Sequence, residues 1–113
     1  MKSKNKESCC SPNKNKPDLR PVEGKVADDE LAALTKAVGH PIRVQILRLL
    51  LQKEACICGD IVDETSLAQS TVSQHLKVLK EAGLIRGDIK GPSVCYCIDS
   101  RGLRRLKVLV AGL

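Results

Sequence analysis

Hydrophobic residues recur at helical spacing over most of the chain. A first helix is expected to run to Val38, with Asp28 or Asp29 as its N-terminal cap. Pro41 suits the first turn of a second helix, and a short third helix is expected over residues 58–64. The side chains expected to face inward on the first two helices are Leu31, Leu34, Val38, Ile42, Ile46, Leu49 and Leu50.

A fourth helix is predicted over residues 69–81, because Val72, Leu76 and Leu79 lie on one face at spacings of four and three. Gly83 follows this helix, in the usual place of a left-handed C-terminal cap. The opposite face carries small hydroxyls, an amide and lysines, which suit the base edges and phosphates of a DNA major groove. The candidate DNA-binding residues of this helix are Ser70, Thr71, Ser73, Gln74, Lys77 and Lys80.

Two extended runs, residues 84–89 and 93–98, predict a β-hairpin with one apolar face. On this hairpin, Arg86 and Lys90 are further candidates for contacts with phosphates. Ser100 is expected to cap a final helix, whose buried stripe consists of Leu103, Leu106 and Val110. The sequence therefore predicts a mainly α fold with a small β-hairpin, a winged helix–turn–helix of about five helices and a two-stranded wing.

The first 27 residues are rich in Lys, Asn, Ser and Pro and carry few apolar side chains. They cannot bury enough surface to offset their ordering entropy, so we interpret residues 1–27 as a mobile basic arm. Residues 28–113 then form one DNA-binding and dimerisation domain. Residues 1–25 hold seven basic and three acidic side chains, which is +4 of the total net charge of +6. The rest is only mildly basic, so charge alone is a weak argument for a nucleic-acid partner.

Composition excludes several classes of function. Tyr96 is the only aromatic residue, which excludes a base-stacking platform and an aromatic cage. No apolar run approaches the ~18 residues of a membrane span, and the first twenty residues lack the apolar stretch of a secretory signal. We therefore expect a cytoplasmic protein with no membrane partner, whose six cysteines bind metal or act as redox thiols.

Three segments resemble the ArsR/SmtB family of bacterial repressors. STVSQHLKVL at residues 70–79, followed by EAGL at residues 81–84, resembles the recognition helix of that family. GHPIR at residues 39–43 resembles the start of its second helix. CICGD at residues 56–60 resembles its metal-binding segment, which usually reads Cys-Val-Cys-Asp.

The resemblance covers about residues 28–110. It implies a homodimeric repressor that metal or metalloid binding releases from double-stranded operator DNA. It also implies that the first and last helices form the dimer interface, which would contain Leu31, Leu34, Leu103 and Leu106.

Three positions depart from the family pattern. The family often has Ser at the position of Ala68, so the recognition helix lacks that cap, or Ser66 replaces it. Gly59 is inserted before the usual acidic residue. The family's zinc site on the final helix is missing, because this helix contains no His. We interpret the two histidines, His40 and His75, as structural residues.

The cysteines form three close pairs, and thiolates select soft ions. The candidate ligands are Cys9, Cys10, Cys56 and Cys58, with Cys95 and Cys97 as the second choice. Residues two apart on a regular helix point ~200° apart, so Cys56 and Cys58 share an ion only if Cys56 precedes the helix or binding opens its first turn. Three thiolates suit trivalent arsenic or antimony, and four suit cadmium or lead. A structural role is the simpler interpretation of the hairpin pair.

These observations predict a repressor and not an enzyme, with arsenite or antimonite as inducer, or cadmium or lead, and no organic cofactor. The alternative is a thiol redox-sensing regulator of the same fold, with disulfides as the switch. A small thiol enzyme would need a Cys paired with a base or a Cys-x-x-Cys motif, and neither is present. A metal-buffering protein without DNA binding is disfavoured by the recognition-helix motif.

Overall fold

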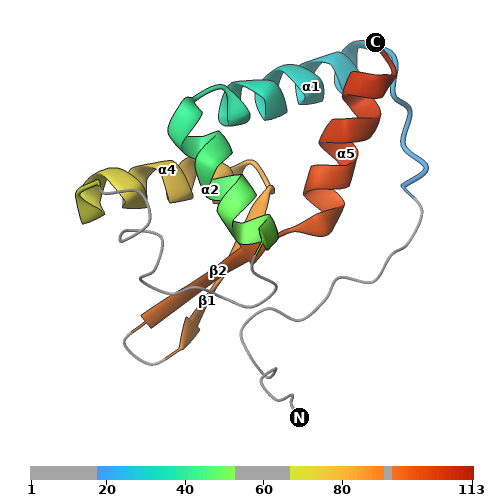
Figure 1. The fold of residues 1–113 in the computed structure, drawn as a ribbon. Helices are drawn as coiled ribbons and strands as arrows, with labels where there is room; N and C mark the ends of the chain where they lie inside the picture. Colours follow the sequence, from blue (N-terminus) through green and yellow to red (C-terminus); the bar gives the residue numbers. More distant parts are fainter. Residues whose placement is uncertain (1–17, 53–66, 91–92) are drawn as a thin grey trace.

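The computed structural model describes residues 18–52, 67–90 and 93–113, which form four helices and one antiparallel β-hairpin (Figure 1). The helices are α1 (Lys25–Val38), α2 (Pro41–Gln52), α4 (Gln69–Glu81) and α5 (Ser100–Ala111), and the strands are β1 (Ile85–Lys90) and β2 (Ser93–Ile98). This mainly helical architecture with a two-stranded wing confirms the predicted fold class. The short helix expected over residues 58–64 lies outside the described residues. None of the described helices is long and apolar enough to cross a membrane.

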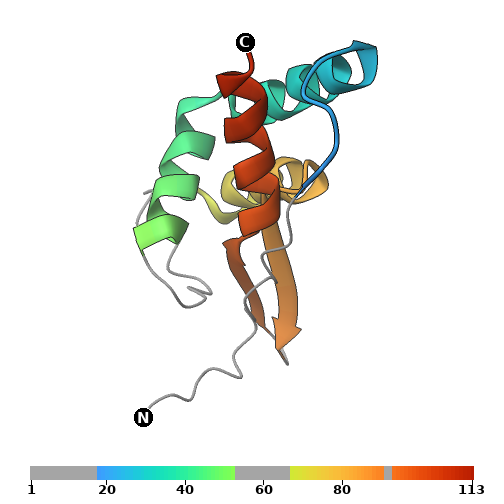
Figure 2. The ribbon, with the colours of Figure 1, turned by 90° about the vertical axis from the view of Figure 1, so that its right-hand side faces the viewer.

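The hydrophobic core lies where the helices meet the hairpin. α1 packs against α5, which leads from the hairpin to the C-terminus, and α2 contacts both α4 and β2 (Figures 1 and 2). The most deeply buried side chains come from α2, α4, β1, α5 and the turn before β1: Ile46, Val72, Leu79, Leu84, Ile85 and Leu109. A single core therefore supports both α4 and the wing.

α1 begins at Lys25, earlier than predicted. Gly24 occupies the N-cap position with a φ of 101°, and its carbonyl oxygen accepts the amide of Asp28 at 2.9 Å. Asp28 thus lies in the first turn, where the partial positive charge of the helix N-terminus favours a carboxylate. The predicted cap at Asp28 or Asp29 is wrong, because an acidic residue suits the first turn as well as the cap. Ala27, assigned to the arm by composition, is buried in the core.

The inward face of α5 is offset by one residue from the predicted stripe. Arg105 and Leu109 are only 4% and 1% exposed, and Gly102 lies one turn before them on the same face. The two leucines of the predicted stripe are partly buried at the edge of the core. Val110 is 47% exposed, so its predicted burial is wrong. Apolar spacing alone cannot reveal that a cation and a glycine occupy the inward face.

α5 is capped by Asp99 and not by Ser100, which is the first residue of the helix. The Oδ1 atom of Asp99 accepts the amides of Arg101 at 3.1 Å and Gly102 at 3.3 Å. This carboxylate satisfies two of the amides that have no partner within the helix. Of two adjacent residues that can both cap a helix, the geometry selects the acid.

α4 has the predicted bounds and ends as predicted at Gly83, which has a φ of 82°. The amide of Leu84 donates to the carbonyl oxygen of Leu79 at 3.0 Å, a bond typical of helix ends with a left-handed residue. The backbone of α5 lies against this turn, since any side chain at Gly102 would overlap the carbonyl oxygen of Gly83. β1 follows directly, so this turn sets the position of α4 relative to both α5 and the wing.

Candidate nucleic-acid interface

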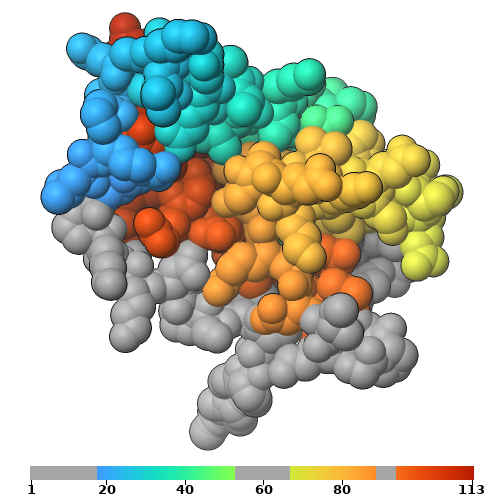
Figure 3. All heavy atoms as spheres, turned by 180° about the vertical axis from the view of Figure 1, so that it is seen from behind, coloured from blue at the N-terminus to red at the C-terminus, as the bar shows by residue number. Residues whose placement is uncertain are grey.

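α4 lies at the molecular surface beside the hairpin and exposes the predicted polar face (Figure 3). Its aliphatic side confirms the predicted stripe, because Val72, Leu76 and Leu79 are at most 5% exposed. All six candidate DNA-binding residues of the helix are exposed: Ser70, Thr71, Ser73, Gln74, Lys77 and Lys80. Hydroxyl and amide groups at the start of a helix, followed by lysines, can contact base edges and phosphates together.

Among the described residues, no side chain caps the N-terminus of α4. Ala68 occupies the N-cap position with an extended backbone and offers no side-chain acceptor, and Ser66 lies outside the described residues. The amides of the first helical turn therefore suit an acceptor from another molecule, and a helix N-terminus favours anions such as phosphate. The exposed hydroxyls of Ser70 and Thr71 lie in the same turn.

The hairpin carries the other two candidates for phosphate contacts. Lys90 is the last residue of β1, so its backbone lies at the tip of the wing. Arg86 pairs with Cys97 across the two strands and is half-buried. Its Nη2 atom lies 4.0 Å from the Sγ atom of Cys97. The structure thus brings a cysteine and a candidate DNA-binding arginine together, which the sequence did not predict.

The predicted metal ligands are only partly described. Four of them lie outside the described residues: Cys9, Cys10, Cys56 and Cys58. Cys95 and Cys97 lie on one face of β2, as predicted, opposite Asp88 and Arg86 of β1. Cys97 is 7% exposed and takes part in a disulfide bond, in which Cys95 is not its partner. Over residues 18–52, 67–90 and 93–113, no cluster of three or more His, Cys, Asp or Glu side chains is arranged to hold a metal ion.

Arg43 of α2 binds both α1 and α4, and the sequence did not predict these contacts. Its Nε atom donates to Nδ1 of His75 on α4 at 3.1 Å. Its Nη1 atom donates to the last carbonyl oxygens of α1, those of Lys36 at 3.3 Å and Ala37 at 3.0 Å. A guanidinium at a helix C-terminus also interacts favourably with the helix dipole. Arg43 lies in the motif GHPIR and His75 in the motif STVSQHLKVL, but the spacing within neither motif indicates that these two side chains meet.

The two histidines lie side by side, with ring centroids 4.5 Å apart. Nδ1 of His40 accepts the amide of Ile42 at 3.1 Å and so caps the start of α2. The pKa of His75 lies below its usual value, first because burial disfavours the charged form and then because His40 and Arg43 add positive charge. Both Nδ1 atoms are engaged with protein donors.

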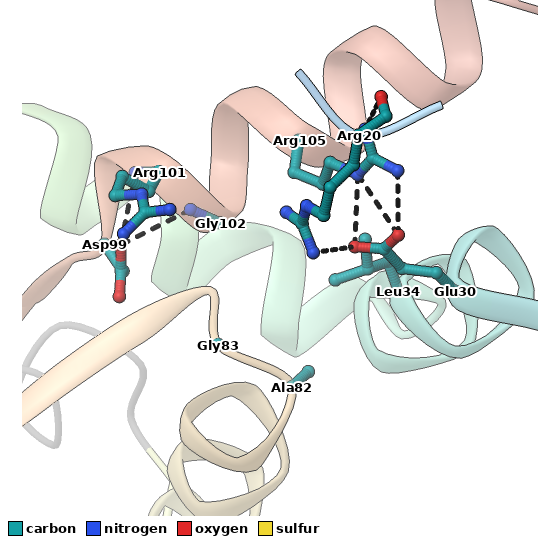
Figure 4. Close-up of a pocket in the computed structure, with 9 residues that line it drawn as sticks. All are labelled: Arg20, Glu30, Leu34, Ala82, Gly83, Asp99, Arg101, Gly102 and Arg105. Atoms are coloured by element: carbon teal, nitrogen blue, oxygen red, sulfur yellow. Dashed lines mark hydrogen bonds and ion pairs between the residues drawn. The ribbon is translucent and has the colours of Figure 1, made fainter. Parts of the chain in front are cut away.

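A buried cation lies between α1 and α5 (Figure 4). Nη2 of Arg105 lies 3.0 Å from Oε1 of Glu30 and donates to the carbonyl oxygen of Pro21 at 2.7 Å. Arg20 approaches the same carboxylate, with 3.5 Å between its Nη1 atom and Oε2. Burial of a charge requires a partner and satisfied hydrogen bonds, and this cluster supplies both. The contacts attach the segment before α1 to the last helix.

The same cluster lines a cavity of about 340 Å³ beside the turn at Gly83 (Figure 4). Its two carboxylates are committed, Glu30 to the ion pair and Asp99 to the cap of α5. Outside the cavity, hydrogen bonds from Arg20 keep the pKa of Asp18 well below its usual range. We therefore interpret this cavity as part of the framework that positions α5.

The predicted dimer residues occupy two environments. Leu31, Leu103 and Leu106 are partly buried at the edge of the core, so each keeps some surface exposed. Leu34 is 6% exposed and belongs to the protomer's own core. Additional aliphatic side chains exposed on α1 and α5 are Val26, Val108 and Val110.

Comparison with known sequences places this geometry in a family. Residues 40–86 match the family model described as bacterial regulatory protein, arsR family. An uncharacterised helix–turn–helix transcriptional regulator of Methanocaldococcus jannaschii is 35% identical over 83 residues, which span 72% of this chain and 92% of that protein. The transcriptional repressor SmtB of Mycobacterium tuberculosis is 37% identical over 78 residues, 69% of this chain but only 57% of that protein.

A solved structure, titled as a possible transcriptional regulator for arsenical resistance, has the same fold. It superimposes with a TM-score of 0.65 at 27% identity, over 71% of this chain and 82% of the other. The matched family segment contains α2, α4 and the start of β1, the elements that present the polar face and join at Arg43. The chain therefore belongs to the arsR family of bacterial regulatory proteins, and it is a transcriptional regulator and not an enzyme.

Proposed function

We propose that this chain is a repressor that reads double-stranded operator DNA with α4. The exposed polar face of this helix carries the proposal, because three buried aliphatic residues fix which side faces outward. The N-terminal residues of a recognition helix contact base edges in the major groove, and Gln74 can bind adenine with two hydrogen bonds. Lys77 and Lys80 would neutralise phosphates, together with Arg86 and Lys90 of the wing.

The repressor acts as a homodimer through α1 and α5. Leu31, Leu103 and Leu106 keep apolar surface exposed, and Val110 continues the stripe of α5 outward. A two-fold dimer presents two recognition helices to half-sites about one helical turn apart, roughly 34–36 Å. We leave Leu34 out of this interface, since the protomer's own core buries it.

The inducer is arsenite or antimonite, bound by thiolates. The chain has six cysteines and two histidines, and both histidines are engaged in contacts within the protein. Thiolates select soft ions such as the metalloids, and the His-containing zinc site that the family has on its last helix is missing from this sequence. The ligands come from Cys9, Cys10, Cys56 and Cys58, of which the first pair lies in the N-terminal segment before Asp18; all four would suit cadmium or lead. Support also comes from the solved structure described as a possible transcriptional regulator for arsenical resistance.

A thiol redox switch is the second candidate. One observation favours it: Cys97 takes part in a disulfide bond and its Sγ atom lies 4.0 Å from Arg86. Reducing that bond would change the surroundings of a side chain proposed to contact DNA. In this alternative, oxidation and not metalloid binding would set the affinity for the operator.

Fluorescence anisotropy with DNA from the region upstream of the chain's own gene tests these alternatives. The reduced protein is expected to bind this DNA more tightly than a scrambled duplex and to be released by arsenite while a reductant is present. Release by the thiol oxidant diamide, with no response to arsenite, would instead establish the redox switch. Equal affinity for the scrambled duplex would contradict sequence-specific repression.

A further inference from the structure

The contact between α2 and α4 depends on a neutral imidazole. Nδ1 of His75 accepts a hydrogen bond from Nε of Arg43, and only an unprotonated ring nitrogen can accept. Nδ1 of His40 likewise accepts the amide of Ile42. Each of these two neighbouring rings, which are tilted by 45° to one another, therefore carries its proton on Nε2 in the observed arrangement.

We propose that Arg43 is a positioning residue for α4, which it holds against the corner of α1 and α2 through neutral His75, and that protonation of His75 releases this contact. The inference rests on the proposed function, in which α4 reads DNA. It concerns how the helix is held and released, which is separate from the thiols that sense an inducer.

The contact is suited to fixing orientation. Among the described residues, the turn at Gly83 fixes the C-terminal end of α4 and the aliphatic stripe packs the rest of it against the core, and apolar packing is non-directional. A hydrogen bond has a preferred distance and angle, so it resists rotation of the helix about its own axis. His75 follows Gln74 directly on α4, so a rotation that breaks the contact also moves a residue of the proposed reading face.

The charges around His75 oppose its protonation. Arg43, on α2, places a positive charge against His75, and a charged ring of His40, directly before α2, would oppose a second proton on the pair. α1 contributes to this corner through the carbonyl oxygens of Lys36 and Ala37, which Arg43 already binds. No carboxylate within the described part of the chain, β1 included, is ion-paired with His75. A proton on Nδ1 of His75 would therefore be repelled by the guanidinium of Arg43, and it would also remove the acceptor of their hydrogen bond.

The direction of the pH dependence follows from the lowered pKa of His75. The folded arrangement binds the proton less well than the free side chain does, so the contact is complete above the ordinary value of about 6.5. The contact is lost as the pH falls through the pKa of His75 in the folded protein, which is lower than that of the free side chain. We therefore expect α4 to loosen on acidification.

We call the hydrogen-bonded contact between Arg43 and neutral His75 the clamp. Nuclear magnetic resonance and amide hydrogen exchange test it without DNA. The ring nitrogens of His75 should show the Nε2-protonated neutral tautomer at about pH 8. Between about pH 8 and about pH 5, protection of α4 amides, corrected for intrinsic exchange rates, should fall by up to about tenfold relative to that of α5. His75→Asn keeps an acceptor near the same place and does not titrate, so its α4 protection should not respond to pH.

Two arginine variants complete the design. Arg43→Lys keeps the charge but loses the planar group that spans His75 and two carbonyl oxygens, so α4 should show the low protection at both pH values. Arg48→Lys is the matched control, because Arg48 is exposed on the same helix, and it should behave as the unmodified protein. The clamp is overturned if the protection of α4 in the unmodified protein does not change with pH. It is also overturned if the protection of α4 in His75→Asn changes with pH as it does in the unmodified protein.

Affinity for operator DNA separates the clamp from the proposed function. The unmodified protein is expected to lose up to about tenfold more affinity on acidification than His75→Asn does. If α4 protection responds to pH as described while DNA affinity of the two proteins stays equal, the clamp is upheld. The assignment of α4 as the reading helix then fails.

Discussion

Gly102 of α5 lies directly against the carbonyl oxygen of Gly83, at the turn that ends α4. The two backbones approach so closely that a side chain on Gly102 would overlap that oxygen. The turn is itself fixed by the left-handed φ of Gly83 and by the bond from Leu84 to Leu79. The proposed dimer helix and the proposed reading helix are thus joined through rigid backbone.

Gly102→Ala is expected to destabilise the fold by about 1–3 kcal/mol, because backbone must move to admit the new methyl group. Without this overlap, replacing a helical glycine by alanine would raise the free energy of unfolding by up to about 1 kcal/mol. The sign of the change in that free energy therefore tells which effect dominates. Urea denaturation gives the free energy of unfolding. Gly112→Ala is the control, since its methyl group would meet only the Val22 side chain and atoms of the last turn. A stabilised Gly102→Ala would contradict the close approach.

Glu30→Gln is expected to lower the free energy of unfolding by about 2–3 kcal/mol. It removes the nearer of two carboxylates paired with the buried guanidinium of Arg105, the other being Asp18 at 3.9 Å, and breaking a fully buried pair costs about 3–5 kcal/mol. The carboxylate of Glu30 is partly exposed, which places the expected value at the lower end. Asp29→Asn, which removes an exposed pair with Lys25, should cost less than about 1 kcal/mol. Equal effects of the two variants would show that Arg105 does not depend on Glu30.

Gln74→Ala and Lys77→Ala should weaken DNA binding in different ways. Loss of Gln74 should cost about 1–3 kcal/mol on the operator and relax the preference for one base. Loss of Lys77 should weaken binding to all sequences alike and reduce the salt slope by about one. Anisotropy titrations at several salt concentrations measure both quantities. Unchanged affinity in both variants would remove this face of α4 from the interface.

Leu106→Glu should dissociate the proposed dimer, because it places a charge in the half-buried stripe that two copies would share. Val110→Glu tests the same surface at a more exposed position, where the fold of the protomer is less affected. Lys107→Glu introduces the same side chain at an exposed neighbouring position and should leave the dimer intact. Sedimentation velocity measures the oligomer, and circular dichroism checks that each variant is folded. A dimer that survives both substitutions would place the interface elsewhere.

Cys56→Ser should keep DNA binding and lose release by arsenite, because it removes a proposed thiolate ligand but no DNA contact. Removal of residues 1–12 should weaken the response while changing operator affinity little beyond the loss of arm charge. Cys97→Ser tests the redox alternative, since that switch requires the sulfur of the disulfide-bonded Cys97. Arsenite titrations of the bound complex measure each response. If arsenite releases Cys56→Ser from DNA at the concentration that releases the unmodified protein, the proposed ligand set is wrong. Cys95 and Cys97 then become the next candidate ligands.

Local signals in the sequence determined several elements. Pro41 begins α2, α4 covers Gln69–Glu81 and Gly83 ends it, all as predicted. The second strand also has its predicted bounds, and the first begins at Ile85, one residue later than expected. These features depend on neighbours within one or two turns, so proline, glycine and the aliphatic period of α4 suffice to predict them. The polar face of α4 follows from the same period.

Tertiary contacts decided the rest. The face of α5 that points inward is set by Gly102 meeting Gly83 and by Arg105 meeting Glu30, a residue 75 positions away. Arg43 and His75 lie 32 positions apart, and neither has a local pattern that marks the other. A buried charge is favourable only where a distant segment supplies its partner, and a glycine is required only where another backbone approaches. Local sequence contains no record of such distances, so these residues could be identified only from the folded chain.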